Sequence, residues 1–140
     1  MEERILKIEE KDFEFGDETC GMSYSGFVIT TNKHIYKIGI DNSQQCCERF
    51  DCKAYFSSGY LMTEDEIEDF IGAEFLGIEV VDADKKVYEV FDIYDGEAIF
   101  VNIKTSKGVF QIVVYNEHNG YYGHEVKIIK DDKTIREVYL

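Results

Sequence analysis

Short apolar segments rich in Val, Ile, Tyr and Phe recur about every ten residues along the chain, and Gly, Asn and Asp stand between them. This spacing is typical of antiparallel β-strands joined by tight turns. It predicts strands over residues 5–10, 26–31, 34–40, 54–56, 74–81, 87–93, 98–104, 109–115, 125–129 and 134–139. We expect most neighbouring strands to pair as hairpins.

One segment predicts a helix. Thr63 and Glu66 have the spacing of a capping box. In this motif the Thr63 hydroxyl accepts from the Glu66 amide, and the Glu66 carboxylate reaches back to the amide of Thr63. Ile67, Phe70 and Ile71 follow at helical spacing, and Gly72 ends the element. We therefore expect a short helix near residues 64–71 with one face packed on a sheet.

The strand over residues 109–115 is mostly apolar on both faces, so it should be central or have both faces covered. Taken together, the elements predict an α+β, mostly β fold. It would be a twisted antiparallel sheet or partly closed barrel with one short helix. The length of 140 residues predicts a single β-rich domain over residues 1–140. Unprotected strand edges in such a fold also make a homo-oligomer plausible.

Charge narrows the choice of partner. The net charge is −14, and residues 61–100 hold 13 acidic and 2 basic side chains. Such a field repels nucleic acid and attracts basic protein surfaces. The simpler interpretation is that acidity keeps the protein in solution. The first residues lack the basic and apolar regions of a signal peptide, and no apolar run reaches the ~20 residues of a membrane span. We therefore expect a cytosolic protein that binds neither nucleic acid directly nor membranes.

Functional side chains concentrate in two loops. Residues 116–125 carry two histidines, two tyrosines and two glycines between apolar strands, and residues 44–48 read Gln-Gln-Cys-Cys-Glu. They predict a ligand site made by Cys46, Cys47, Glu48, His118, Asn119, Tyr121, Tyr122 and His124. Aromatic rings with polar tips favour recognition surfaces. The alternative is that Asn119 and Gly120 make a hairpin whose tyrosines pack on the sheet.

These loops also carry a resemblance to a known family. Its elements, in chain order, are Thr31-Asn32-Lys33-His34, Asp41-Asn42, the Cys-Cys-Glu loop, Phe70-Ile71-Gly72-Ala73 and residues 118–124. Over residues 24–130 the chain resembles a family of uncharacterised small proteins from Gram-positive bacteria and their phages. The resemblance implies a fold and a phage or prophage context, with no established activity. The chain departs from it after Cys-Cys-Glu, where Phe50-Asp51-Cys52 stands in place of an expected glycine.

The chain holds cysteines and histidines that could bind a metal ion or act as a nucleophile and its base. The potential zinc ligands are Cys20, Cys46, Cys47, Cys52, His34, His118 and His124. No Cys-x-x-Cys pair is present, so the spacing argues against a structural zinc site, although Cys47, His118 and His124 remain a candidate set. Cys46 or Cys47 beside a histidine is the candidate nucleophile, but no sequence context supports it. We expect packed side chains, no cofactor and no bound metal.

These observations predict a non-enzymatic binding protein, because a strong acidic field is present and no specific catalytic motif is. The phage context sharpens this to an inhibitor that occupies the basic nucleic-acid channel of a host defence protein, with carboxylates replacing phosphates, as an anti-CRISPR protein would. The predicted contact residues are Glu64, Asp65, Glu68 and Asp69. The alternatives are a small-molecule or metal-binding protein that uses the Cys/His/Tyr loops, and an oligomeric structural protein.

Overall fold

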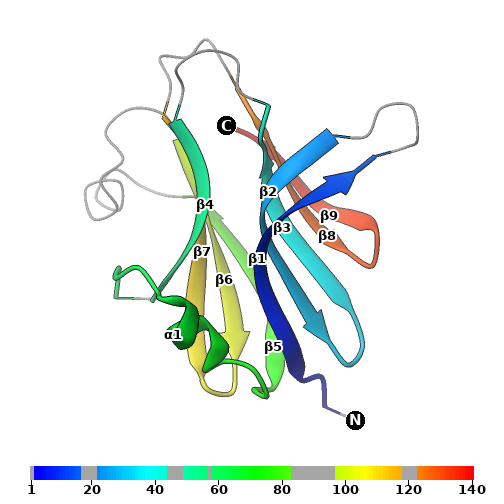
Figure 1. Cartoon of the computed structure of the whole chain (residues 1–140), viewed down its shortest axis with the longest axis vertical. Helices are drawn as coiled ribbons and strands as arrows, with labels where there is room; N and C mark the ends of the chain where they lie inside the picture. Colours follow the sequence, from blue (N-terminus) through cyan, green and yellow to red (C-terminus); the bar gives the residue numbers. More distant parts are fainter. Residues whose placement is uncertain (1, 17–21, 44–48, 57, 83–96, 118–122) are drawn as a thin grey trace.

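The computed structural model describes residues 2–16, 22–43, 49–56, 58–82, 97–117 and 123–140. Its strands form two antiparallel sheets, which face each other and diverge toward the upper end of Figure 1. A single short helix, α1 (Glu64–Glu68), is present in the described part of the chain, and neither sheet closes into a barrel there. The predicted mostly β, antiparallel class is confirmed, in the form of two open sheets.

The larger sheet has five strands in the order β1-β2-β3-β8-β9. Their bounds are β1 Ile5–Phe15, β2 Met22–Thr31, β3 Ile35–Asp41, β8 Glu125–Lys130 and β9 Lys133–Tyr139. Hairpin turns join β2 to β3 and β8 to β9, as predicted. The pairing of β3 with β8 joins segments far apart in the chain, so no local turn signal predicts it.

The smaller sheet has four strands in the order β4-β7-β6-β5. Their bounds are β4 Arg49–Phe56, β5 Phe75–Asp82, β6 Glu97–Thr105 and β7 Gly108–Glu117. Strand β7 lies between β4 and β6, which confirms the prediction that this apolar strand is central. The fully buried Ile112, Val113 and Val114 lie on both of its faces, because successive side chains of a strand point to opposite sides.

One apolar core joins the two sheets. Phe27 and Ile38 contribute from the five-stranded sheet, and Val101 and Ile112 contribute from the four-stranded sheet, all fully buried. Alternation of buried and exposed positions along these strands directs one face of each sheet inward. The inner faces of the two sheets therefore stabilise each other, and the site must be sought at strand ends, edges and outer faces.

Helix α1 confirms the capping box and corrects its length. The Thr63 hydroxyl accepts from the Glu66 amide, and the Glu66 carboxylate accepts from the Thr63 amide. The helix ends at Glu68 rather than near residue 71, because the following amides bond three residues back and tighten into turns. Ile67 and Phe70 are buried in the common core, as predicted, whereas Ile71 is 37% exposed. In the described segments, no helix has the length and apolar character needed to cross a membrane.

Several strands are longer than predicted. Strands β1, β2 and β4 each extend by four or five residues at one end, into stretches that the alternation of apolar residues does not mark. In β1 the added residues follow Glu10 and are mostly charged, so the sequence pattern seemed to end there. The predicted strand at residues 87–93 lies outside the described residues.

A pair of glycines shapes the outer face of the five-stranded sheet. Gly26 of β2 pairs with Gly39 of β3, and an added Cβ at Gly39 would lie 2.7 Å from Cζ of Phe13. The Phe13 ring covers Gly39 and stacks on Tyr24 with centroids 5.6 Å apart, while the Lys37 ammonium lies 5.9 Å from the centroid of the Phe13 ring. Side chains of β1 therefore reach across β2 to β3, which ties the edge strand to the sheet.

Candidate functional site

Most of the predicted ligand loop residues, namely Cys46, Cys47, Glu48, His118, Asn119, Tyr121 and Tyr122, lie outside the described residues. The described residues beside them are informative. Arg49 and Phe50, which follow the first loop, pair with Glu117 and Asn116, which precede the second. The β4–β7 register therefore brings one end of each loop to the same end of the four-stranded sheet, where β4 begins and β7 finishes.

His124 is the one member of that predicted set that the structure describes, and it is a packed side chain. It is 1% exposed, its Nδ1 lies 2.6 Å from the Asp41 carbonyl oxygen, and its ring lies 4.2 Å from the Phe50 ring. Its backbone exchanges two hydrogen bonds with Leu140. Asp41 precedes the Cys-Cys-Glu loop and Phe50 follows it, so His124 joins the two flanks of that loop to β8.

Cys52 and His34 do not form a metal site. Cys52 is 2% exposed, burial raises the pKa of its thiol, and its Sγ lies 3.9 Å from the Ile38 carbonyl oxygen. A thiol held protonated in the core is a poor metal ligand. Within the described parts of the chain, no three His, Cys, Asp or Glu side chains are placed to hold a metal ion.

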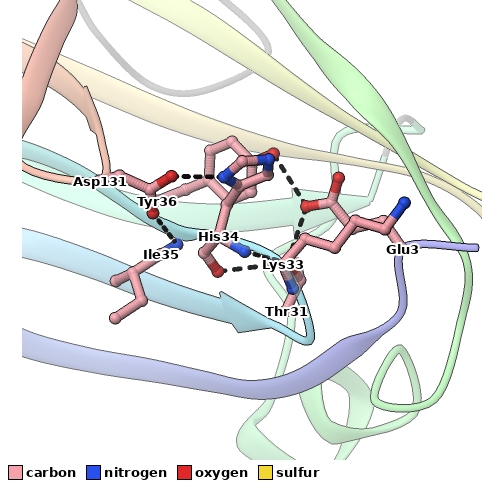
Figure 2. A network of polar contacts seen from close by, with 7 residues as sticks. All are labelled: Glu3, Thr31, Lys33, His34, Ile35, Tyr36 and Asp131. Atoms are coloured by element: carbon pink, nitrogen blue, oxygen red, sulfur yellow. Dashed lines mark hydrogen bonds and ion pairs between the residues drawn. The ribbon is translucent and has the colours of Figure 1, made fainter.

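His34 belongs to a polar network that the sequence did not predict (Figure 2). Its Nδ1 pairs with Oδ2 of Asp131, and the other carboxylate oxygen accepts from the Ile35 amide at 2.9 Å. On the other side of the network, one carboxylate oxygen of Glu3 accepts from the hydroxyls of Thr31 and Tyr36 at 2.7 and 2.9 Å. The network thus joins the start of β1, the β2–β3 turn and the β8–β9 turn.

The electrostatics of this network indicate a structural role, in which it holds the three segments together, and we call it the clamp. The Ile35 amide, followed by the His34 ring, lowers the pKa of Asp131. Burial and the hydrogen bond to Glu3 raise the pKa of Tyr36 well above its usual range. The Thr31 hydroxyl also accepts from the amides of Lys33 and His34, so it is fully engaged as donor and acceptor. The raised pKa keeps the Tyr36 phenol protonated at neutral pH.

The predicted acidic residues lie on and after α1, and all four are exposed. Glu64 and Glu68 are four residues apart, so they share one helix face. Both line a groove that the helix forms with β1, whereas Asp65 and Asp69 do not. The structure therefore divides the predicted set into a pair at a concave site and a pair outside it.

The groove has a volume of about 280 Å³ and is lined by Ile8, Glu9, Glu10, Glu64, Ile67 and Glu68. Ile8 and Ile67 are at least nine-tenths buried and form an apolar floor, and the four carboxylates stand around it. A second hollow of about 210 Å³ continues from Glu10 along β1 and is lined by Glu10, Lys11, Asp12, Ser25, Gly26, Asp51 and Cys52.

The charges in the groove are only partly balanced. The Lys53 ammonium lies 2.8 Å from Glu10, and this hydrogen bond raises the pKa of Lys53. Glu9 lies 3.4 Å from Lys7 and 3.6 Å from Lys11. Among the described residues, no lysine or arginine forms an ion pair with Glu64 or Glu68. The helix side of the groove is therefore its uncompensated side.

Sequence analysis missed Glu9 and Glu10 as site residues. The predicted strand over residues 5–10 ended at Glu10. Charged residues are common on solvent-exposed edge strands, so the sequence alone did not mark Glu9 and Glu10 as groove residues. The signal that was present is the run Glu9-Glu10-Lys11-Asp12, which is unusually acidic for a strand interior. Only the packing of α1 beside it turned this run into one wall of a groove.

Comparison with known proteins places the chain in a family. Residues 2–128 match the model of DUF7448, a domain of unknown function. The chain belongs to this family. No curated protein matches the chain, and no solved structure does either. Membership confirms that the chain belongs to an uncharacterised domain family.

Proposed function

We propose that this DUF7448 protein is a non-enzymatic binding protein that engages a basic protein surface through the groove between β1 and α1. The observation that carries the proposal is the ring of Glu9, Glu10, Glu64 and Glu68 around an apolar floor, with no cation paired to the two helix residues in the described chain. Like charges held this close favour a cationic partner, because it relieves their mutual repulsion.

The overall charge supports the same partner. A net charge of −14 attracts basic surfaces over a distance and speeds their encounter with the groove. Basic protein surfaces of this kind commonly bind nucleic-acid phosphates, which carboxylates can replace. The resemblance to phage and prophage proteins supports a finer form of the proposal, in which the partner is a nucleic-acid-binding host defence protein and the groove competes with its nucleic acid.

A titration with a nona-arginine peptide tests the groove. The Glu64→Lys/Glu68→Lys variant should bind the peptide at least about tenfold more weakly than the unmodified protein, which corresponds to 1.4 kcal/mol. The Glu79→Lys/Glu137→Lys variant is the matched control. It changes the net charge equally and alters exposed residues on β5 and β9 that do not line the groove, and Glu79→Lys in addition breaks an ion pair with Lys104 at 2.8 Å.

The control variant should lose less than about threefold in affinity, because screening reduces the influence of charges beyond about 10 Å at 0.1 M salt. Equal losses in the two variants would show that the peptide responds to total charge alone. Such a result would remove the groove from the proposal.

A further inference from the structure

Strand β1 forms one edge of the five-stranded sheet, and its hydrogen-bonding directions can be assigned from its neighbours. In the β2–β3 hairpin, the Thr31 amide donates to His34 and the Asn42 amide donates to Ser23, so odd-numbered residues of β2 bond to β3. Backbone groups of a strand alternate between its two neighbours. The even-numbered residues of β2 therefore bond to β1.

The register carries this assignment to β1. Val28 pairs with Glu9 and Gly26 with Lys11, so Glu9 and Lys11 direct their N–H and C=O groups toward β2. The N–H and C=O groups of Ile8, Glu10 and Asp12 consequently point outward from the sheet. No backbone group in the described parts of the chain bonds to them.

The chain already uses the first part of this edge for strand pairing. The Ile5 amide donates to Ala73, the Gly72 amide donates to Ile5, and the Phe75 amide donates to Glu3. Residues 72–75 thus run antiparallel to the start of β1. They leave it before Ile8, and from there α1 stands beside the edge across the groove. In Figure 1 the helix lies beside the lower half of β1, and the strand continues upward beyond it.

We infer that this edge receives an extended basic segment of a partner protein, which pairs by its backbone with Ile8, Glu10 and Asp12 and directs lysine or arginine side chains into the groove. The inference deepens the proposed function and rests on it. Strand addition of this kind takes affinity from backbone hydrogen bonds and specificity from every second side chain. The groove, at about 280 Å³, lies below the roughly 300–1,000 Å³ typical of small-molecule pockets and suits a side chain.

The lining of the groove matches a long cationic side chain. Its aliphatic stem would lie on Ile8 and Ile67, and its charged head would lie among the carboxylates of the helix. The charges also argue against a second copy of this chain as the occupant. Antiparallel pairing of two β1 strands around Lys11 would place Glu10 of each copy opposite Asp12 of the other, and like charges directly opposite destabilise a sheet.

The test uses an eight-residue peptide of alternating arginine and valine, together with the same peptide carrying an N-methyl group on every backbone amide. N-methylation of every amide removes the donors of both edges of the peptide and leaves its charge unchanged, so the test holds for either strand direction. We expect the N-methylated peptide to bind the unmodified protein about threefold to tenfold more weakly than the unmethylated peptide, because backbone hydrogen bonds are lost.

A protein variant tests the same contact from the other side. Glu10→Pro removes an outward N–H without removing a hydrogen bond to β2, a place where proline is tolerated in edge strands. Glu10→Gln is the control, because it removes the same charge and keeps the N–H. Glu10→Pro should weaken binding of the unmethylated peptide at least about threefold beyond Glu10→Gln, and circular dichroism checks that both variants fold.

The outcomes separate the two proposals. If the peptides bind equally well and both depend on Glu64 and Glu68, strand addition is overturned and the acidic groove stands. If neither the alternating peptide nor nona-arginine binds, the inference and the proposed function fall together. Should Glu10→Pro not fold, the comparison of methylated and unmethylated peptides on the unmodified protein still decides the question.

Discussion

Two regions of the molecule differ in how their polar groups are used. Around His124, the side-chain nitrogen, the ring face and the backbone all have partners within the protein, at Asp41, Phe50 and Leu140. Along the outer edge of β1, the backbone groups of Ile8 and Glu10 have none among the described residues. A polar group satisfied inside the protein stabilises the fold, whereas one left open at a groove is available to a partner.

The sequence drew attention to the histidine- and tyrosine-rich loop, whereas the described structure leaves backbone groups without partners at the edge of β1. The histidine- and tyrosine-rich loop has the densest functional groups in the chain, yet the histidine that the structure describes there, His124, is 1% exposed and packs against its neighbours. Between Ile8 and Phe13, strand β1 carries only two glutamates, a lysine and an aspartate, which are ordinary surface residues. The chemical variety of a segment therefore does not by itself place its side chains at the surface.

The largest effect that tests this contrast is expected from His124→Ala. It removes a buried ring and leaves the Asp41 carbonyl without that partner, so we expect the free energy of unfolding to fall by about 3 kcal/mol. Peptide binding at the groove should be unchanged under conditions where the variant is folded. Urea denaturation followed by circular dichroism measures the loss.

The control for that variant is His34→Ala. The His34 side chain is 32% exposed and lies in the clamp, so its removal should destabilise the protein less. If His124→Ala left stability unaltered but abolished peptide binding, the two regions would have exchanged roles, and the contrast would be wrong.

A smaller effect is expected from Thr63→Ala at the start of α1. Loss of the capping box should lower the free energy of unfolding by about 1 kcal/mol. Because α1 carries Glu64 and Glu68, we expect peptide affinity to fall slightly as well. Thr63→Ser keeps the hydroxyl and should retain both properties. A loss of stability as large for serine as for alanine would mean that packing of the threonine methyl, rather than capping, is responsible.

The smallest effect concerns the clamp at Asp131, which lies far from the groove in the sequence and on another hairpin. Its carboxyl has a lowered pKa in the folded protein, so it contributes stability above its unfolded pKa of about 3.9 and loses it as the pH falls through the folded value. Asp131→Asn should therefore be less stable than the unmodified protein at neutral pH, and this difference should shrink below about pH 4.

Asp132→Asn is the matched control for this prediction. Asp132 also has a positive φ, of 65°, in the same turn, and its ion pair with Lys37 is long, at 3.9 Å. Asparagine tolerates such backbone conformations, so neither variant should strain the turn. Measurement of unfolding free energy from pH 3 to 7 compares the three proteins. A pH-independent difference for Asp131→Asn would show that its charge is not what the clamp uses.

Local patterns predicted much of the fold correctly. The alternation of apolar residues indicated the β class, the doubly apolar run indicated the central position of β7, and Thr63 and Glu66 indicated the helix start. These features depend on residues within a few positions of one another. The strand ends were predicted less well, since charged residues at the end of β1 continue the strand through pairing with β2 rather than through their own apolar pattern.

The sequence by itself determined that this protein is β-rich and acidic, with one capped helix, because periodicity, charge and capping are written in neighbouring residues. Only the tertiary structure decided that β3 pairs with β8 and β4 with β7, which sets the strands that become edges. It also decided that α1 lies beside the open edge of β1, while His124 is enclosed. Strand partners far apart in the chain are selected by the packing of the whole core, and no local pattern encodes that choice.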